Sequence, residues 1–144
     1  MLLTAITMSS NLSKDIPLLE GSNYLLWADA MKSFLRSQGV WQIVEGGQPQ
    51  PVIPNATATN AVQVKEATDE VFAWNNKNDM ANGYMVMRIS PLLHHIVTQK
   101  DYSKEIWDTL ATAFGDQGPA LIYMEFKSAL MVRILAANPT VNIN

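Results

Sequence analysis

Apolar residues recur at helical spacing in the first well-patterned stretch of the chain, residues 21–44. Those on one face are Tyr24, Trp27, Ala28, Met31, Phe34 and Leu35. Polar and charged residues fall opposite, so the pattern predicts an amphipathic helix. Ser22 or Asn23 is suited to cap its start through a side-chain oxygen. Gly39 is suited to end it in the left-handed conformation.

Apolar residues also flank this predicted helix on both sides. Val40, Trp41, Ile43 and Val44 follow it at once, which indicates that the chain turns back and buries more apolar area. Before it, residues 12–19 are predicted to form an apolar strap. Residues 16–19 of the strap are predicted to be extended, because Pro17 disfavours helix at Ile16. Residues 45–61 carry Gly and Pro and predict a loop, which is long for a connection and favours a mobile surface segment.

A second helical region begins near Val62, and its pattern is firm from Thr68. Its apolar stripe contains one polar residue, Asn78, and comprises Val71, Trp74, Asn78, Ala81, Met85 and Ile89. We expect Pro91 to end this helix. Residues 92–97 then predict a short helix or helical turn.

The next predicted helix is Lys104–Phe114, capped by Asp101 or Ser103. Its buried face is expected to hold Ile106, Trp107, Leu110, Ala113 and Phe114. Gly115 and the Gly118–Pro119 pair then interrupt the chain.

The last predicted helix, residues 120–137, is apolar nearly all round. One stripe holds Leu121, Met124, Met131, Val132 and Leu135, and a second holds Tyr123, Phe126, Leu130 and Ile134. A helix of this kind is normally buried on several sides. We therefore expect it to pack against something that this chain does not supply, and we take the second stripe as the candidate self-association face. The alternative is that this stripe belongs to the ordinary core.

These patterns together predict an all-α fold, a compact bundle of about five helices with a long Pro- and Gly-containing loop after the first helix. We expect a disordered lead-in over residues 1–11, a single helical domain over residues 12–137 and a frayed tail over residues 138–144. No segment has the roughly 18 consecutive apolar residues of a membrane span, and a soluble cytoplasmic protein is expected.

Composition narrows the function classes. The 144 residues suit one domain, and charged residues make up only 16%. The formal net charge of −3 and the dispersed Lys and Arg argue against strong nucleic-acid binding. The chain has no cysteine, which excludes disulfides and thiolate zinc sites.

No arrangement of residues predicts catalysis or a metal site. His94 and His95 are adjacent, so on a helix they point about 100° apart and do not share one metal. No nucleophile elbow or Gly-rich phosphate loop is present, and we expect neither an enzyme nor a cofactor nor a small-molecule substrate. The four tryptophans sit at apolar positions and are expected to be core.

The first helical region and its flanks carry a recognisable motif. Its positions are Leu19, Gly21, Asn23, Tyr24, Trp27, Met31, Leu35 and Gly39-Val40-Trp41. This motif resembles the opening motif of copia-type LTR-retrotransposon Gag polyproteins. In that family an apolar residue and Gly precede an Asn-Tyr pair, with Trp three residues on, Met or Leu four later and then a Gly-Leu-Trp-like turn.

Further segments resemble that family in the same order. Trp74 matches the start of its second helix signature, and Ile89 to Ile96 is similar to its Ile-x-x-x-Leu segment. Glu105 to Phe114, with Trp107 and Leu110, resembles its Ala-x-x-Trp-x-x-Leu element followed by an aromatic residue. The last helix resembles its Leu-x-x-x-Leu segment. The resemblance covers roughly Pro17 to Met131.

The resemblance implies a capsid-like structural domain that associates with itself toward virus-like particles. It also implies that this chain is the N-terminal capsid domain alone, from a truncated element, a fragment or a host-retained copy, since the family's Cys-Cys-His-Cys zinc knuckle is not in it. The alternatives are a host-retained adaptor that binds a protein or peptide partner, with the Pro-rich loop framing a groove, and weak RNA binding.

Overall fold

The fold is built from helices alone within the part of the chain that the structure describes. The computed structural model describes residues 14–116 and 119–137, with side chains for 14–116 and 127–137. Its elements are α2 (Tyr24–Ser37), α3 (Trp41–Glu45), α4 (Ala61–Met87), the 3₁₀ helix η1 (Pro91–Ile96), α5 (Ser103–Phe114) and α6 (Pro119–Ala137). The all-α prediction is confirmed, and the predicted lead-in and tail lie outside the described residues.

Helix α2 ends as its sequence predicts. Gly39 has φ +72°, and its N–H donates to Arg36 O while the N–H of Val40 donates to Leu35 O. These two bonds are the pair that defines a Schellman motif, in which glycine takes the left-handed position without steric cost. The motif turns the chain into α3, whose Trp41, Ile43 and Val44 are buried as expected.

The start of α2 differs from the prediction in its hydrogen bonds. Asn23 is the N-cap residue, but its side chain caps no N–H of the helix. Instead its Oδ1 accepts from Glu20 N–H at 2.9 Å and its Nδ2 donates to Leu18 O at 2.8 Å. The Asn23 side-chain amide therefore holds the preceding strap against the helix. The spacing of residues in the sequence does not predict these two partners.

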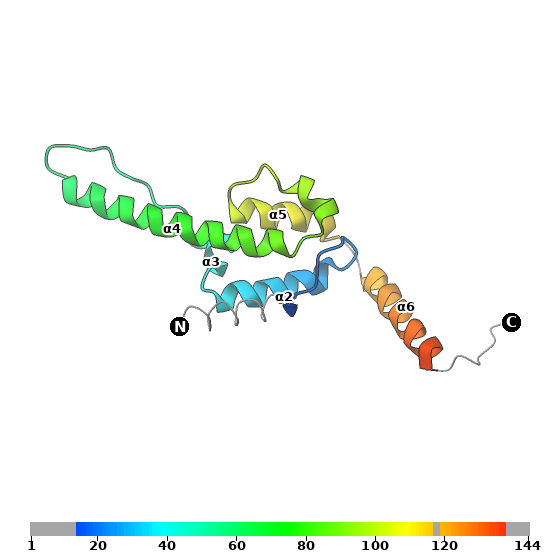
Figure 1. The fold of residues 1–144 in the computed structure, drawn as a ribbon. Helices are drawn as coiled ribbons and strands as arrows, with labels where there is room; N and C mark the ends of the chain where they lie inside the picture. Colours follow the sequence, from blue (N-terminus) through cyan, green and yellow to red (C-terminus); the bar gives the residue numbers. More distant parts are fainter. Residues whose placement is uncertain (1–13, 117–118, 138–144) are drawn as a thin grey trace.

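Helices α2, α3, α4 and α5 pack around one hydrophobic core. In Figure 1, α2 lies along one side of α4 and α5 along the other, and α3 contacts all three. The fully buried side chains at its centre include Leu19, Trp27, Met31, Leu35, Met85, Ile89, Ile106 and Leu110. One predicted core residue is not there, because Ala113 on α5 is exposed.

The strap is held by residues that follow α4. Leu19 N–H donates to Arg88 O at 2.8 Å, and Ser90 N–H donates to Leu19 O at 2.9 Å, which makes a single parallel bridge between Leu19 and Ile89. The Arg88 guanidinium also donates to Ile16 O. Helix α4 consequently ends at Met87, before the Pro91 at which the sequence predicted its break.

Helix α5 begins at Ser103 without a cap from its own segment. Neither Asp101 nor Ser103, the two predicted caps, caps it through a side chain, and Tyr102 is the N-cap residue. The Ser103 N–H donates instead to Asn78 Oδ1 at 2.8 Å, while Asn78 Nδ2 donates to Asp101 O at 2.8 Å. The polar residue in the apolar stripe of α4 therefore supplies the missing cap from across the bundle.

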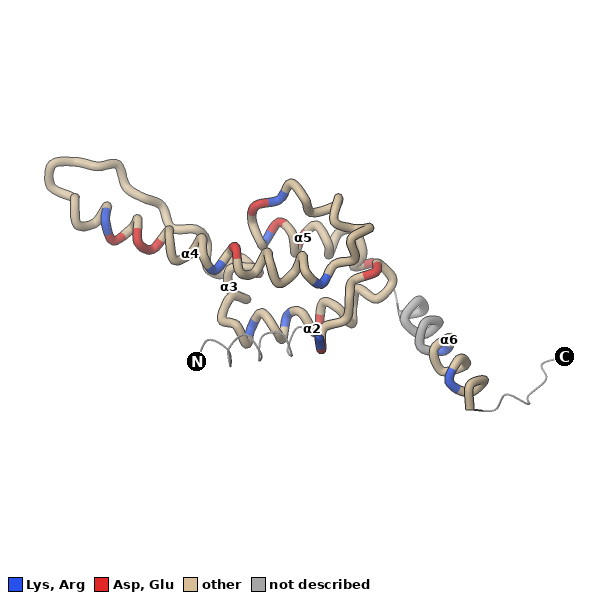
Figure 2. Tube along the Cα trace, in the orientation of Figure 1, with Lys and Arg blue, Asp and Glu red and all other residues tan. Residues whose placement is uncertain are grey.

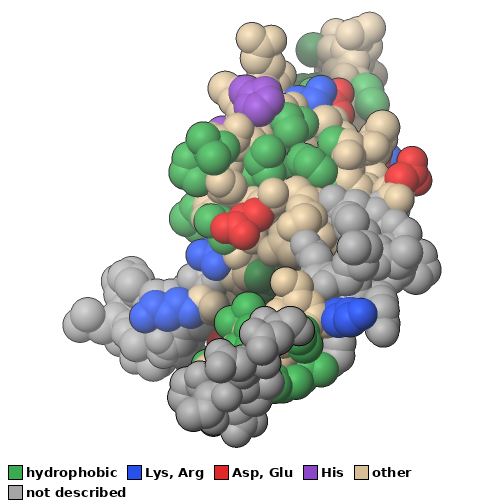
Figure 3. Space-filling model, turned by 90° about the vertical axis from the view of Figure 1, so that its right-hand side faces the viewer, with side chains coloured by type: hydrophobic (Ala, Val, Ile, Leu, Met, Phe, Trp, Pro, Cys, Tyr) green, Lys and Arg blue, Asp and Glu red, His purple; other side chains and the backbone are tan. Residues whose placement is uncertain are grey.

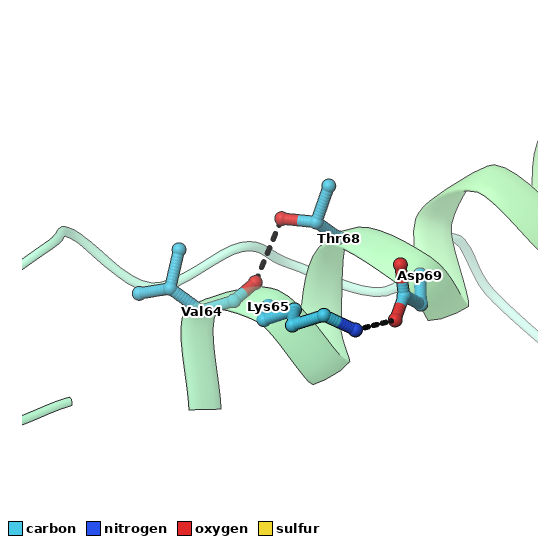
Figure 4. Close-up of polar contacts among 4 residues, drawn as sticks. All are labelled: Val64, Lys65, Thr68 and Asp69. Carbon is cyan, nitrogen blue, oxygen red and sulfur yellow. Dashed lines mark hydrogen bonds and ion pairs between the residues drawn. The ribbon is translucent and has the colours of Figure 1, made fainter. Parts of the chain in front are cut away.

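The first half of α4 extends beyond the other helices, and residues 46–60 run back along it without helical structure (Figure 1). Two exposed contacts lie there (Figure 4): the Lys65–Asp69 ion pair at 3.0 Å and a bond from Thr68 Oγ1 to Val64 O. Exposed i,i+4 pairs of this kind contribute only about 0.3–0.5 kcal/mol. This arm therefore depends mainly on the continuity of a 27-residue helix.

Candidate functional site

The residues that carry the family resemblance form the core. Of that set, Tyr24, Trp27, Met31, Leu35, Trp41, Trp74 and Leu110 are buried, and Trp107 and Phe114 are partly buried and packed against them. Gly21 has φ +99°, and a Cβ added there would lie 3.4 Å from Phe114 Cε1. Glycine is thus favoured at this position by both conformation and packing. The residues of the motif therefore hold the helices of the bundle together by packing in its core.

Three tryptophans form one aromatic cluster between α2, α3 and α5. The Trp107 ring stacks on Trp27 with centroids 5.9 Å apart and meets Trp41 edge to face at 5.0 Å. Trp27 Nε1 donates to Arg88 O, and Trp74 Nε1 donates to Gln48 O. Trp41 Nε1, also buried, has no hydrogen-bond partner among the described residues. An unpaired buried donor costs about 1–3 kcal/mol, so this nitrogen lowers the stability of the cluster.

Among the described residues, burial clearly shifts the pKa of one titratable group, the phenol of Tyr24. Removal of Tyr24 from solvent raises the pKa of its phenol above the usual 10.0, and the Asp108 carboxylate raises it further. Both effects keep the hydroxyl protonated. A group shifted in this direction at neutral pH offers no activated nucleophile or base.

The histidine pair does not form a metal site in the described residues. His94 is part-buried and its Nε2 pairs with Ile89 O at 2.8 Å, while His95 is exposed. Figure 3 shows the histidines on the surface beside hydrophobic side chains. Among the described residues, no three His, Cys, Asp or Glu side chains gather closely enough to hold a metal ion.

Charged residues are dispersed along the described chain, with acidic and basic side chains interspersed (Figure 2). The described ion pairs, Lys65–Asp69 and Lys104–Asp108, each join residues four apart on one helix. Lys32 and Arg36 on α2 are in neither pair. Within residues 14–116 and 127–137, no helix gathers the run of cations that binding to a phosphate backbone would require.

Helix α6 projects away from the bundle (Figure 1). Leu130 and Ile134 of the predicted association face are 46% and 45% exposed, and Met131 and Leu135 of the other stripe are 44% and 41% exposed. The side chains of Tyr123 and Phe126 lie outside the described ones. Over residues 127–137, therefore, both apolar stripes face solvent. None of the described helices is long and apolar enough to cross a membrane.

Two hollows lie at either side of the segment that follows α3. The first, of about 370 Å³, is lined by Arg36, Gly39, Trp41, Gln42, Glu45 and Gln48. The second, of about 420 Å³, lies between that segment, α4 and the start of α5, with Trp74 and Tyr102 among its lining residues. Gln48 borders both. The sequence suggested that the Pro-rich loop frames a groove, and Pro49 and Gln50 of that loop line the second hollow. The first hollow was not predicted, because its walls come from separate elements.

Comparison of the chain with protein-family models, with curated proteins and with solved structures found no match.

Proposed function

We propose that this chain is a structural scaffold domain, like the N-terminal capsid domain of copia-type Gag proteins, that associates with copies of itself through α6. The observation that carries the proposal is the exposure of two apolar stripes on one helix. Leu130 and Ile134 lie one turn apart on one stripe, and Met131 and Leu135 on the other. A single copy of the chain leaves all four in solvent within the described part of α6.

The physical drive for association is burial of apolar area, at roughly 25 cal/mol per Å². Helix α6 has 19 residues and is therefore about 28 Å long, enough for a symmetric contact over several turns. Its described charges are only Lys127 and Arg133. A paired α6 therefore buries few ionic groups. The face we assign to the contact is that of Tyr123, Phe126, Leu130 and Ile134.

Sedimentation velocity over protein concentrations from about 1 μM to about 1 mM tests this proposal. We expect the mean mass to rise with concentration. The double substitution Leu130→Glu/Ile134→Glu should weaken association by about a hundredfold or more, because each unpaired carboxylate buried in the contact costs several kcal/mol. A chain that stays monomeric at the highest concentration contradicts the proposal.

Two control variants separate the contact face from a general effect of charge. Met131→Glu/Leu135→Glu changes residues of nearly the same exposure on the other stripe and should weaken association less. Val62→Glu/Phe72→Glu changes exposed apolar residues on α4 and should leave association unchanged. If the α4 variant weakens association as much as the α6 variants do, α6 is not the contact.

A further inference from the structure

The second hollow, of about 420 Å³, presents a mainly apolar surface between the loop after α3, α4 and the start of α5. Two aromatic residues from separate elements line it. Trp74 of α4 and Tyr102, the N-cap residue of α5, have ring centroids 6.1 Å apart and planes tilted by 53°. Trp74 is 6% exposed and Tyr102 is 44% exposed. Tyr102 is therefore the aromatic residue that a ligand can reach most directly.

The chain already places one proline at this hollow. Pro49 lines it, and Trp74 Nε1 donates at 2.9 Å to the carbonyl of Gln48, the residue before that proline. A bond from Gln48 N–H to Gln42 O at 3.0 Å also fixes the loop. Proline-rich peptides bind grooves lined by aromatic side chains, and their extended backbone makes no internal hydrogen bonds, so its carbonyls are free to accept. The Gln48-Pro49 unit shows that this hollow accommodates such a pair of residues.

Tyr102 offers the same two features to a residue from outside the chain. The indole N–H of Trp74 is used by Gln48, whereas the Tyr102 hydroxyl makes no hydrogen bond among the described residues. A tyrosine hydroxyl can donate to a backbone carbonyl. Tyr102 therefore provides an exposed ring for a second proline and a donor for the carbonyl that precedes it.

The charge at the hollow is negative. Its charged lining residues are Lys104 and Glu105. Lys104 Nζ donates to the Asp108 carboxylate, which offsets its charge, whereas Glu105 is exposed and takes part in no ion pair among the described residues. A cationic side chain is complementary to Glu105, and a phosphate group would be repelled by it.

We propose that this hollow binds a proline-rich peptide that carries an arginine or a lysine next to its prolines. A proline of the peptide packs against Tyr102 and Pro49, the carbonyl before it accepts from the Tyr102 hydroxyl, and the basic residue pairs with Glu105. Such a peptide has its extended conformation before it binds, so it loses little conformational entropy. The site lies on the loop, α4 and α5, and the proposal is independent of association through α6.

The test follows the four indole N–H signals of the full chain by ¹H–¹⁵N NMR. Titration with the peptide acetyl-Ala-Pro-Pro-Ala-Pro-Arg-amide up to about 1 mM should move the Trp74 signal saturably and leave the other three indole signals in place. The matched peptide acetyl-Ala-Ala-Ala-Ala-Ala-Arg-amide keeps the charge, lacks the prolines and should produce no saturable shift. An equal response to both peptides, or no response to the first, overturns the proposal.

Three variants at exposed positions test the aromatic contact. Tyr102→Ala should weaken binding about tenfold or more, since it removes the exposed ring of the hollow. Tyr102→Phe keeps the ring, loses the donor and should weaken binding about threefold. The matched control is Phe72→Ala, which removes a 68% exposed aromatic residue that does not line the hollow and should leave the affinity unchanged. If Phe72→Ala weakens binding as much as Tyr102→Ala, the hollow is not the site.

A double-mutant cycle between the chain and the peptide tests the charge assignment. Glu105→Gln, and replacement of the peptide arginine by glutamine, should each weaken binding about two- to fivefold. The two changes together should weaken it no more than either alone, because they remove the same pair. Glu105 lies in the first turn of α5, and any effect of Glu105→Gln on the helix is the same for both peptides and cancels in the cycle. Losses that multiply contradict the pairing.

Two further measurements exclude other occupants. Tyr102→Ala should sediment as the unchanged chain does. If it associates less, the hollow is filled by a second copy and the peptide proposal is wrong. Bases also stack on aromatic rings, so a single-stranded oligoribonucleotide is the second competitor. It should move the Trp74 signal only at higher concentrations than the peptide does, and tighter binding of the oligoribonucleotide refutes the proposal.

Discussion

Asn78 offers the sharpest test of how this bundle is held together. The side chain is buried in α4, accepts the Ser103 N–H at 2.8 Å and donates to Asp101 O at 2.8 Å. Substitution Asn78→Ala removes both bonds and leaves the Ser103 N–H without this partner at the start of α5. Asp101 O still receives a bond from Asn82 Nδ2 at 2.7 Å. The unpaired Ser103 N–H should therefore account for most of the lost stability.

The magnitude follows from these contacts. An unpaired buried donor costs about 1–3 kcal/mol and the lost bond to Asp101 about 1 kcal/mol. The higher helix propensity of alanine than of asparagine offsets about 0.5 kcal/mol of this loss. The free energy of unfolding should fall by about 1.5–3.5 kcal/mol, which lowers Tm by about 5–12 °C for a chain of this length.

Urea unfolding followed by far-UV circular dichroism, with a thermal scan beside it, measures the effect. The matched control is Asn82→Ala, which removes one bond to the same carbonyl from a side chain whose own Oδ1 is unpaired. Its cost should stay below about 1 kcal/mol. If the two variants differ by less than about 0.5 kcal/mol, the assignment of Asn78 as the cap of α5 is refuted.

Three further outcomes are expected. Burial and Asp108 raise the pKa of Tyr24, so its phenol stays protonated in the folded protein at a pH near 10 where it begins to ionise in the unfolded chain. The free energy of unfolding should therefore fall as pH rises above about 10. Urea unfolding at a series of alkaline pH values should show a shallower fall for Tyr24→Phe. Gly39→Ala should cost about 1–2 kcal/mol in the same assay, since φ is +72° but nothing obstructs the new methyl group; no loss would argue against the left-handed turn. Lys65→Gln should change the free energy of unfolding by less than about 0.5 kcal/mol, because the side chains of Lys65 and Asp69 are 79% and 67% exposed. A larger effect would show that the first half of α4 depends on this ion pair.

Local patterns predicted the helices well, and the failures lie where distant segments meet. Apolar spacing and Gly39 were enough to predict the course and the end of α2, because both depend on residues within a few turns. Asn78 was recognised as the one polar residue in its apolar stripe. Its hydrogen-bond partners, Asp101 and Ser103, lie 23 and 25 positions later, and the sequence did not predict them. A single sequence does not show which distant backbone groups lack a partner.

The first hollow was missed for the same reason, and of the second only the Pro-rich loop was indicated. Trp41 was predicted to be core, and it is buried, but nothing in its neighbours indicates that its nitrogen lacks an acceptor. The hollow beside it needs Arg36 from α2 and Gln48 from the loop in addition to α3. The apolar character of α6, in contrast, can be recognised from consecutive residues of one segment. Its apolar side chains are exposed over residues 127–137.

The attachment of the strap bears on the order in which the protein folds. Arg88 binds the carbonyl of Ile16 across a separation of 72 residues, so this bond cannot form until most of the bundle has left the ribosome. At about 5–20 residues per second, Ile16 and Leu19 wait several seconds for the residues that cover them. The strap can therefore dock only after synthesis has passed the end of α4, because Arg88 and Ser90 supply the bonds that hold it.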